Sequence, residues 1–115
     1  MPFRTKPDPF EDSDEEMALI RLRYRIMLEE IKEWKSAAIN NCLASERAKE
    51  LADILYTVFG TIITEGLQDQ IEKAFDEVHK SNMSKLDDNG NPIKRADGKV
   101  MKGPNYEEPD LSFID

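Results

Sequence analysis

The chain has 115 residues, with 24 acidic and 16 basic side chains and a formal net charge of −8. This length allows one compact domain, and the negative charge disfavours nucleic acid and anionic membrane surfaces as partners. A single cysteine excludes an intramolecular disulfide, and no apolar stretch has the length of a signal sequence or a membrane span, so we expect a protein of the reducing cytoplasm with no membrane attachment.

The first part of the chain predicts an extended arm followed by a helix. Residues 1–12 are rich in proline and charged side chains, which is typical of an arm. Ser13 and Glu16 form a capping box that predicts the start of a first helix. Apolar residues then recur at spacings of three and four as far as Asn40, where two consecutive asparagines predict the end of this helix.

A second helix is predicted from about Glu46 to Thr64, with Ser45 as its N-cap and a glycine at its C-terminal end. It is apolar over most of its circumference, so we expect it at the centre of a bundle or at a subunit interface. Its polar residues form one stripe that includes Glu50, Asp53 and several threonines. Either this stripe lines a binding site, or the threonines bond back to carbonyls of their own helix, an alternative that leaves the two acids unexplained.

The last third of the chain predicts a third helix, from Gln68 to about Asn82, followed by irregular structure. Turn signals at Asp88-Asn-Gly and Ala96-Asp-Gly leave room for a short hairpin. The last residues are expected to be extended, with apolar side chains such as Phe113 available to pack on a neighbouring subunit.

These elements predict an all-α fold, a small antiparallel helical bundle that is oligomeric and ends in an irregular tail with room for a short hairpin. We expect three segments: the extended N-terminal arm of residues 1–12, a helical catalytic domain of residues 13–86, and a basic tail of residues 87–115 that completes the site or the oligomer.

Acidic pairs on the first two predicted helices are the strongest sign of function. Glu29, Glu30 and Glu33 lie on the first helix, and Glu50 and Asp53 lie on the second. Residues three or four apart share a helix face, so up to five carboxylates converge if the two helices pack side by side. Like charges at that density repel unless cations neutralise them, and Mg²⁺ or Mn²⁺ suits oxygen ligands.

Four stretches of the chain resemble the MazG-like all-α nucleoside triphosphate pyrophosphohydrolases, which include phosphoribosyl-ATP pyrophosphohydrolase and the dimeric dUTPases. The stretches are residues 21–33 (RLRYRIMLEEIKE), 49–58 (KELADILYTV), 77–86 (EVHKSNMSKL) and 97–106 (DGKVMKGPNY). The last of these is similar to the bacterial and phage branch of the group. The resemblance implies an enzyme of the nucleotide pool that cleaves a nucleoside triphosphate between its α and β phosphates, giving a monophosphate and pyrophosphate.

The resemblance also implies roles for the acids. Glu29, Glu33, Glu50 and Asp53 are then metal ligands, with Mg²⁺ as the cofactor and Mn²⁺ able to substitute. Glu30 is either a further ligand or the base that deprotonates the attacking water.

Side chains beyond the acids are expected to bind the substrate. Lysines of the C-terminal part are candidates for holding the β and γ phosphates, and an asparagine resembles one that the family places near the phosphates or the sugar. These residues are Lys85, Lys99, Lys102 and Asn82. Trp34 and Tyr106 either stack on the base or belong to the core. The resemblance further implies a homodimer or homotetramer.

Several functional interpretations stay open from the sequence. Among substrates we favour dGTP or other purine deoxynucleotides, with dUTP or dCTP as the alternative. A helical interaction module that kept the fold but lost catalysis is a second hypothesis. A third treats the acids as a solvated helix face.

Overall fold

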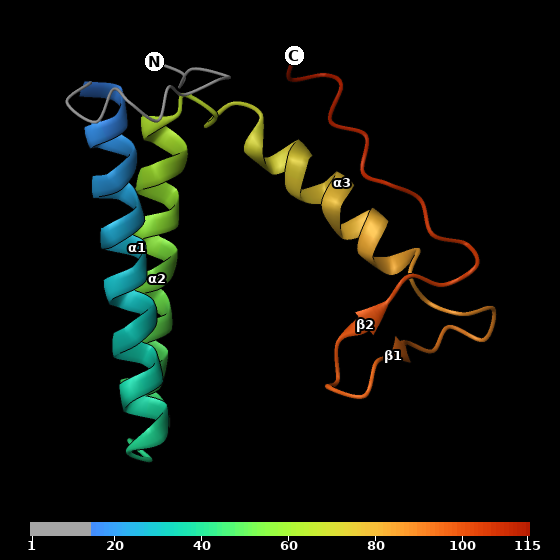
Figure 1. Ribbon diagram of the computed structural model, residues 1–115, viewed down its shortest axis with the longest axis horizontal. Helices are drawn as coiled ribbons and strands as arrows, with labels where there is room; N and C mark the ends of the chain where they lie inside the picture. Colours follow the sequence, from blue (N-terminus) through green and yellow to red (C-terminus); the bar gives the residue numbers. More distant parts are fainter. Residues whose placement is uncertain (1–14) are drawn as a thin grey trace. The chain divides into compact units, whose positions relative to one another are not determined.

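The computed structural model describes residues 15–115, which form three α-helices and one two-stranded sheet (Figure 1). The helices are α1 (Glu15–Ile39), α2 (Ala44–Thr64) and α3 (Ile71–Met83), and the strands are β1 (Ile93–Lys94) and β2 (Val100–Met101). This content confirms the all-α class. The expected arm of residues 1–12 and the expected cap at Ser13 lie outside the described residues. Within residues 15–115, no helix is long and apolar enough to cross a lipid bilayer.

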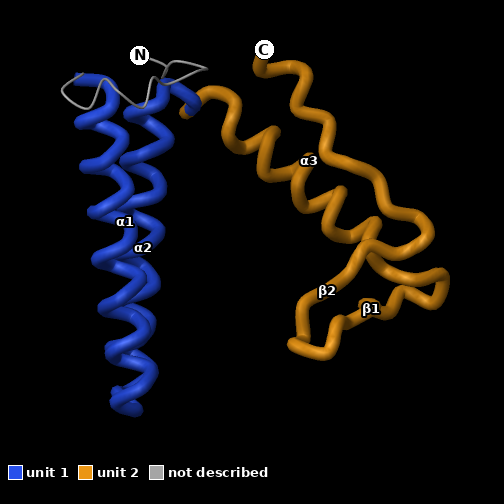
Figure 2. Tube along the Cα trace, viewed as in Figure 1, with its two compact units in different colours: residues 1–67 blue, residues 68–115 orange. Residues whose placement is uncertain are grey.

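The chain divides into two compact units, residues 1–67 and residues 68–115 (Figure 2). In the first unit, α1 and α2 lie side by side and run in opposite directions (Figure 1). The connection between them turns at Asn41, which has a φ of 54°. The N–H groups of Asn41 and Cys42 donate to the carbonyls of Ala38 and Ala37 and so satisfy the last turn of α1. The predicted end of the first helix at the asparagine pair is therefore confirmed.

The two ends of α2 give different outcomes for the predicted caps. The helix begins at Ala44, and the carbonyl of Leu43 accepts the first bonds, so Ser45 already lies inside the helix and its predicted role as N-cap is wrong. At the other end Gly66 has a φ of 72°, and its N–H donates to the carbonyl of Ile63. Glycine tolerates this left-handed conformation, which confirms the predicted stop.

The threonines of α2 bond within the hairpin. The hydroxyls of Thr57 and Thr61 donate to carbonyls one turn earlier in α2, at 2.7 Å and 2.8 Å. Arg23 of α1 reaches across, and its Nε donates to Thr61 Oγ1 at 3.1 Å while its Nη2 donates to the Thr57 carbonyl at 3.0 Å. Gly60 makes room for this guanidinium, because a Cβ there would lie 2.6 Å from Arg23 Nη2. The threonines of the polar stripe therefore bond to carbonyls of their own helix, which was one of the two predicted alternatives.

The outer face of α2 carries an apolar stripe, defined by Leu51, Leu55, Phe59 and Ile63. These residues recur every four positions, and their exposed fractions run from 48% to 64%. Among the described residues of α1 and α2, none is fully buried. A helical hairpin with such an apolar face needs further packing for stability.

In the second unit, the C-terminal segment packs along α3. The hydroxyl of Ser81, a buried residue, donates to the Glu107 carbonyl at 2.7 Å, and the Glu107 N–H donates to Ser84 Oγ at 2.9 Å. Gly103 passes so close to the turn after α3 that a Cβ would lie 2.5 Å from a carbonyl oxygen there. Phe113, which we expected to contact a neighbouring subunit, lies under the Lys73 ammonium of its own chain, 4.3 Å from the ring centroid.

These contacts bear on how the chain is divided. The predicted helical domain of residues 13–86 includes the third helix, and the predicted tail begins at residue 87. In the structure α3 forms one unit with the residues that follow it. The bonds responsible join positions that are 23 to 26 residues apart, so they have no counterpart in a local sequence pattern.

A short hairpin connects α3 to the C-terminal segment, as the turn signals allowed. Strands β1 and β2 are antiparallel, with Ile93 opposite Met101. Gly98, with a φ of 89°, completes the turn between them. The Asp97 carboxylate accepts two bonds from Arg95, and these bonds hold the pKa of Asp97 below its ordinary value.

Candidate metal centre

Four carboxylates of the α1–α2 hairpin converge on one point. Glu30 and Glu33 come from α1 and Glu50 and Asp53 from α2, and each offers an oxygen within 4.8 Å of the others. We call this set the carboxylate group. Each pair is spaced i, i+3 and therefore shares a helix face, and the side-by-side packing of the two helices brings the faces together. The structure thus shows the convergence of acids from both helices that the sequence predicts.

Two oxygens of the carboxylate group are buried without a hydrogen-bond partner in the described part of the chain, Glu30 Oε2 and Glu50 Oε2. Burying a carboxylate oxygen without a donor or a cation is costly, so such atoms call for an explanation. Hard divalent cations bind carboxylate oxygens, and a group of four at this separation suits one or more of them. The chemistry of the donor set therefore fits a divalent metal site.

Glu29 lies outside the carboxylate group and is exposed. Adjacent residues on a helix point ~100° apart, so Glu29 and Glu30 cannot both face α2. From the resemblance, Glu29 is predicted as a ligand and Glu30 as either a ligand or the base. The structure brings Glu30, with Glu33, to the carboxylates of α2.

Lys49 is a neighbour of the carboxylate group and is not among the predicted site residues. Its Nζ lies 2.8 Å from Asp53 Oδ2 and 3.5 Å from Glu50 Oε1. The hydrogen bond with Asp53 raises the pKa of Lys49. The i, i+4 spacing of Lys49 and Asp53 was the signal that could have identified this residue.

A shallow pocket of about 460 Å³ opens beside Lys49 and Glu50 and is also lined by Cys42 and Glu46. A hydrogen bond with Glu46 raises the pKa of the Cys42 thiol, with burial adding to the effect. A raised pKa keeps this thiol protonated and unreactive near neutral pH, which argues against cysteine chemistry in the pocket.

The expected substrate-binding residues are divided between the two units. Trp34 lies on α1, four residues after Glu30 and so on the same face of that helix, and is 37% exposed. The others belong to the second unit, where the Lys102 ammonium lies 4.6 Å from the Tyr106 ring centroid. Lys85 is half-buried, whereas Lys99 and Asn82 are exposed.

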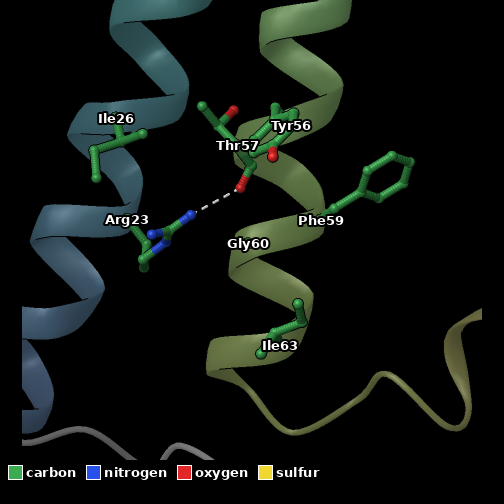
Figure 3. A pocket seen from close by; sticks show the side chains of 7 residues that line it. All are labelled: Arg23, Ile26, Tyr56, Thr57, Phe59, Gly60 and Ile63. Carbon is green, nitrogen blue, oxygen red and sulfur yellow. Dashed lines mark hydrogen bonds between the residues drawn. The ribbon is translucent and has the colours of Figure 1, made fainter.

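A second pocket of the hairpin, of about 540 Å³, contains none of these acids (Figure 3). Its lining is largely apolar, and Arg23 forms its polar wall through the bond to the Thr57 carbonyl that Figure 3 marks. Phe59 and Ile63 of the apolar stripe belong to the lining, so the pocket is continuous with that exposed face. The lining residues are Arg23, Ile26, Tyr56, Thr57, Phe59, Gly60 and Ile63.

The chain was compared with known protein families. A family model described as phosphoribosyl-ATP pyrophosphohydrolase matches residues 3–82, which is well over half of the chain. The matched range contains all four carboxylates and ends before β1 and β2. No curated protein matches the chain.

Proposed function

Since the chain belongs to the phosphoribosyl-ATP pyrophosphohydrolase family and is a pyrophosphohydrolase that acts on a nucleotide-like substrate, we propose that it hydrolyses a (deoxy)nucleoside triphosphate between the α and β phosphates. Purine deoxynucleotides such as dGTP are our preferred substrates, and dUTP or dCTP are the alternative. The carboxylate group, with its two unpartnered buried oxygens, is the observation that carries this proposal.

We assign the binding of Mg²⁺, or of Mn²⁺ in its place, to Glu30, Glu33, Glu50 and Asp53. A bound divalent ion supplies Lewis acidity that offsets the charge of the polyphosphate and promotes the attack of water. Glu30 has a second role in the proposal, because its buried Oε2 has no hydrogen-bond donor among residues 15–115 and is available to accept the proton of the attacking water. Water then adds to phosphorus, the bridging P–O bond breaks, and pyrophosphate leaves.

Binding of the substrate falls to side chains beyond the carboxylate group. We propose that Lys85, Lys99 and Lys102 contact the β and γ phosphates and that Asn82 contacts the phosphates or the sugar. Lys102 and Tyr106 form a cation–π pair, which places a positive charge beside an aromatic ring, two groups that can contact a nucleotide. Trp34 is our candidate for stacking on the base, because it shares a helix face with Glu30.

A panel assay tests the activity. The protein is incubated with Mg²⁺ and each common ribo- and deoxynucleoside triphosphate, and with phosphoribosyl-ATP, and monophosphate and pyrophosphate are quantified. We expect both products in equal amounts from at least one substrate, and none in EDTA. If no substrate yields pyrophosphate and Mg²⁺ leaves the melting temperature unchanged, the non-catalytic module is the better interpretation.

We also propose that the protein is a homodimer or homotetramer in which a second copy covers the apolar stripe. Across the described residues, only Ala74 and Ser81 are buried, which is too small a core for a stable monomer. The pocket beside Gly60 supplies a hollow that a large side chain of the second copy can fill.

Sedimentation velocity tests this assembly. Phe59→Asp places a charge in the stripe and is expected to abolish the oligomer, leaving monomers that are at least partly unfolded. Phe75→Asp on α3, at a residue that is 69% exposed, should leave the assembly intact. A wild-type monomer at micromolar concentration would refute the proposed interface.

A further inference from the structure

The ion pairs of Lys49 with two of the proposed metal ligands suggest that this lysine affects metal binding. We propose that Lys49 is a built-in competitor for the divalent ion, occupying oxygens of Glu50 and Asp53 that the ion needs and leaving when the ion binds. This inference rests on the proposed function, because it assumes that the carboxylate group holds a metal.

Within the carboxylate group, Lys49 forms ion pairs only with the two acids of α2. Its ammonium lies 2.8 Å from Asp53 Oδ2 and 3.5 Å from Glu50 Oε1. Within the described residues, neither Glu30 nor Glu33 of α1 has an ion pair with a basic side chain. One ammonium therefore offsets only part of the charge of four carboxylates, which leaves a strong attraction for further positive charge.

The surroundings of Lys49 allow it to leave. Its side chain is 66% exposed, whereas those of Glu50 and Asp53 are 18% and 37% exposed. The acids are thus held in place by the hairpin, while the four-carbon stem of the lysine can turn into solvent without burying its charge. A divalent ion and the ammonium seek the same oxygens, so each lowers the affinity of the site for the other.

Lys49→Met tests the competition, because it keeps an unbranched side chain of similar length and removes the charge. We expect Mn²⁺ alone, titrated by calorimetry into EDTA-stripped and desalted protein, to bind about two- to fivefold more tightly than to wild type, as the loss of one partly exposed ion pair predicts. Lys49→Arg retains the charge and should bind close to the wild-type value.

The matched control is Lys35→Met, which makes the same change of net charge at an exposed residue of α1. If removal of any positive charge strengthened binding, this variant would gain as much as Lys49→Met. A second readout is stability without added nucleotide. Lys49→Met should melt at a lower temperature than wild type in EDTA and gain more from Mn²⁺, because its carboxylates lack their counter-ion.

The outcomes separate the two proposals. Equal Mn²⁺ affinity of wild type and Lys49→Met, or an equal gain in Lys35→Met, overturns the competition and leaves the metal site standing. If wild type and all variants fail to bind Mn²⁺ or Mg²⁺, the metal site itself is refuted, and the proposed function fails with it.

Discussion

Substitution of two adjacent glutamates of α1 tests the carboxylate group most directly. Glu30→Gln and Glu29→Gln change net charge equally, and both preserve side-chain size and helix propensity. Only Glu30 belongs to the group and buries an unpartnered oxygen, whereas Glu29 is exposed. The pair therefore separates membership of the site from general electrostatics.

The structure sets the size of the expected stability change. Glu30 offers an oxygen within 4.8 Å of those of three other carboxylates. Two unit charges at that distance repel by about 0.9 kcal/mol in water and by about 3.5 kcal/mol at an effective dielectric constant of ~20. The lower figure suits a partly exposed group, and Lys49 offsets some of the repulsion. Without metal, Glu30→Gln should therefore gain about 1 to 2 kcal/mol, or at least ~4 °C in melting temperature.

Activity should change in the opposite direction. Glu30→Gln removes a ligand and the proposed base, so pyrophosphate release should fall by about 100-fold or more, equivalent to about 2.7 kcal/mol of transition-state stabilisation. The rise in melting temperature on addition of Mg²⁺ should also shrink. Glu29→Gln should match wild type in all three measurements. Loss of activity in Glu29→Gln with wild-type behaviour of Glu30→Gln would refute our choice of ligand.

Three further predictions concern the rest of the molecule. Gly103→Ala has no room for its Cβ and should release the C-terminal segment from α3, seen as faster hydrogen exchange after residue 103; unchanged exchange would contradict the contact. Arg95 holds the pKa of Asp97 below 3.8, so this ion pair stabilises the hairpin above that pH. The stability should be lost as the pH falls through the lowered pKa. NMR shifts of the hairpin should report this transition in wild type and lack it in Asp97→Asn. Cys42 should react slowly with iodoacetamide at pH 7.5, and Glu46→Gln should accelerate the reaction, since its carboxylate raises the thiol pKa.

Element boundaries were predictable where local backbone chemistry decides them. Asn41, Gly66 and Gly98 all adopt positive φ, and asparagine and glycine are the residues that tolerate this conformation. The sequence therefore located the ends of the first two helices and the hairpin turn. The prediction of Ser45 as the N-cap was wrong because the sequence alone does not distinguish an N-cap serine from a serine in the first turn. The backbone hydrogen bonds decide between the two positions.

The choice between Glu29 and Glu30 was beyond the reach of the sequence. Glu29 is spaced i, i+4 from Glu33 and Glu30 is spaced i, i+3, so each shares a face with it on an isolated helix. Only the rotation of α1 against α2 decides which one meets Asp53. That rotation depends on packing between residues far apart in the chain, such as the contacts of Arg23 with the threonines of α2.

All four acids come from one hairpin closed by residues 40–43, whereas the lysines proposed to grip the phosphates lie after residue 67. Under the proposed function, this separation makes the enzyme modular. A chimera that exchanges residues 68–115 for those of a relative would alter the grip on the phosphates and keep the bond-breaking machinery of the hairpin.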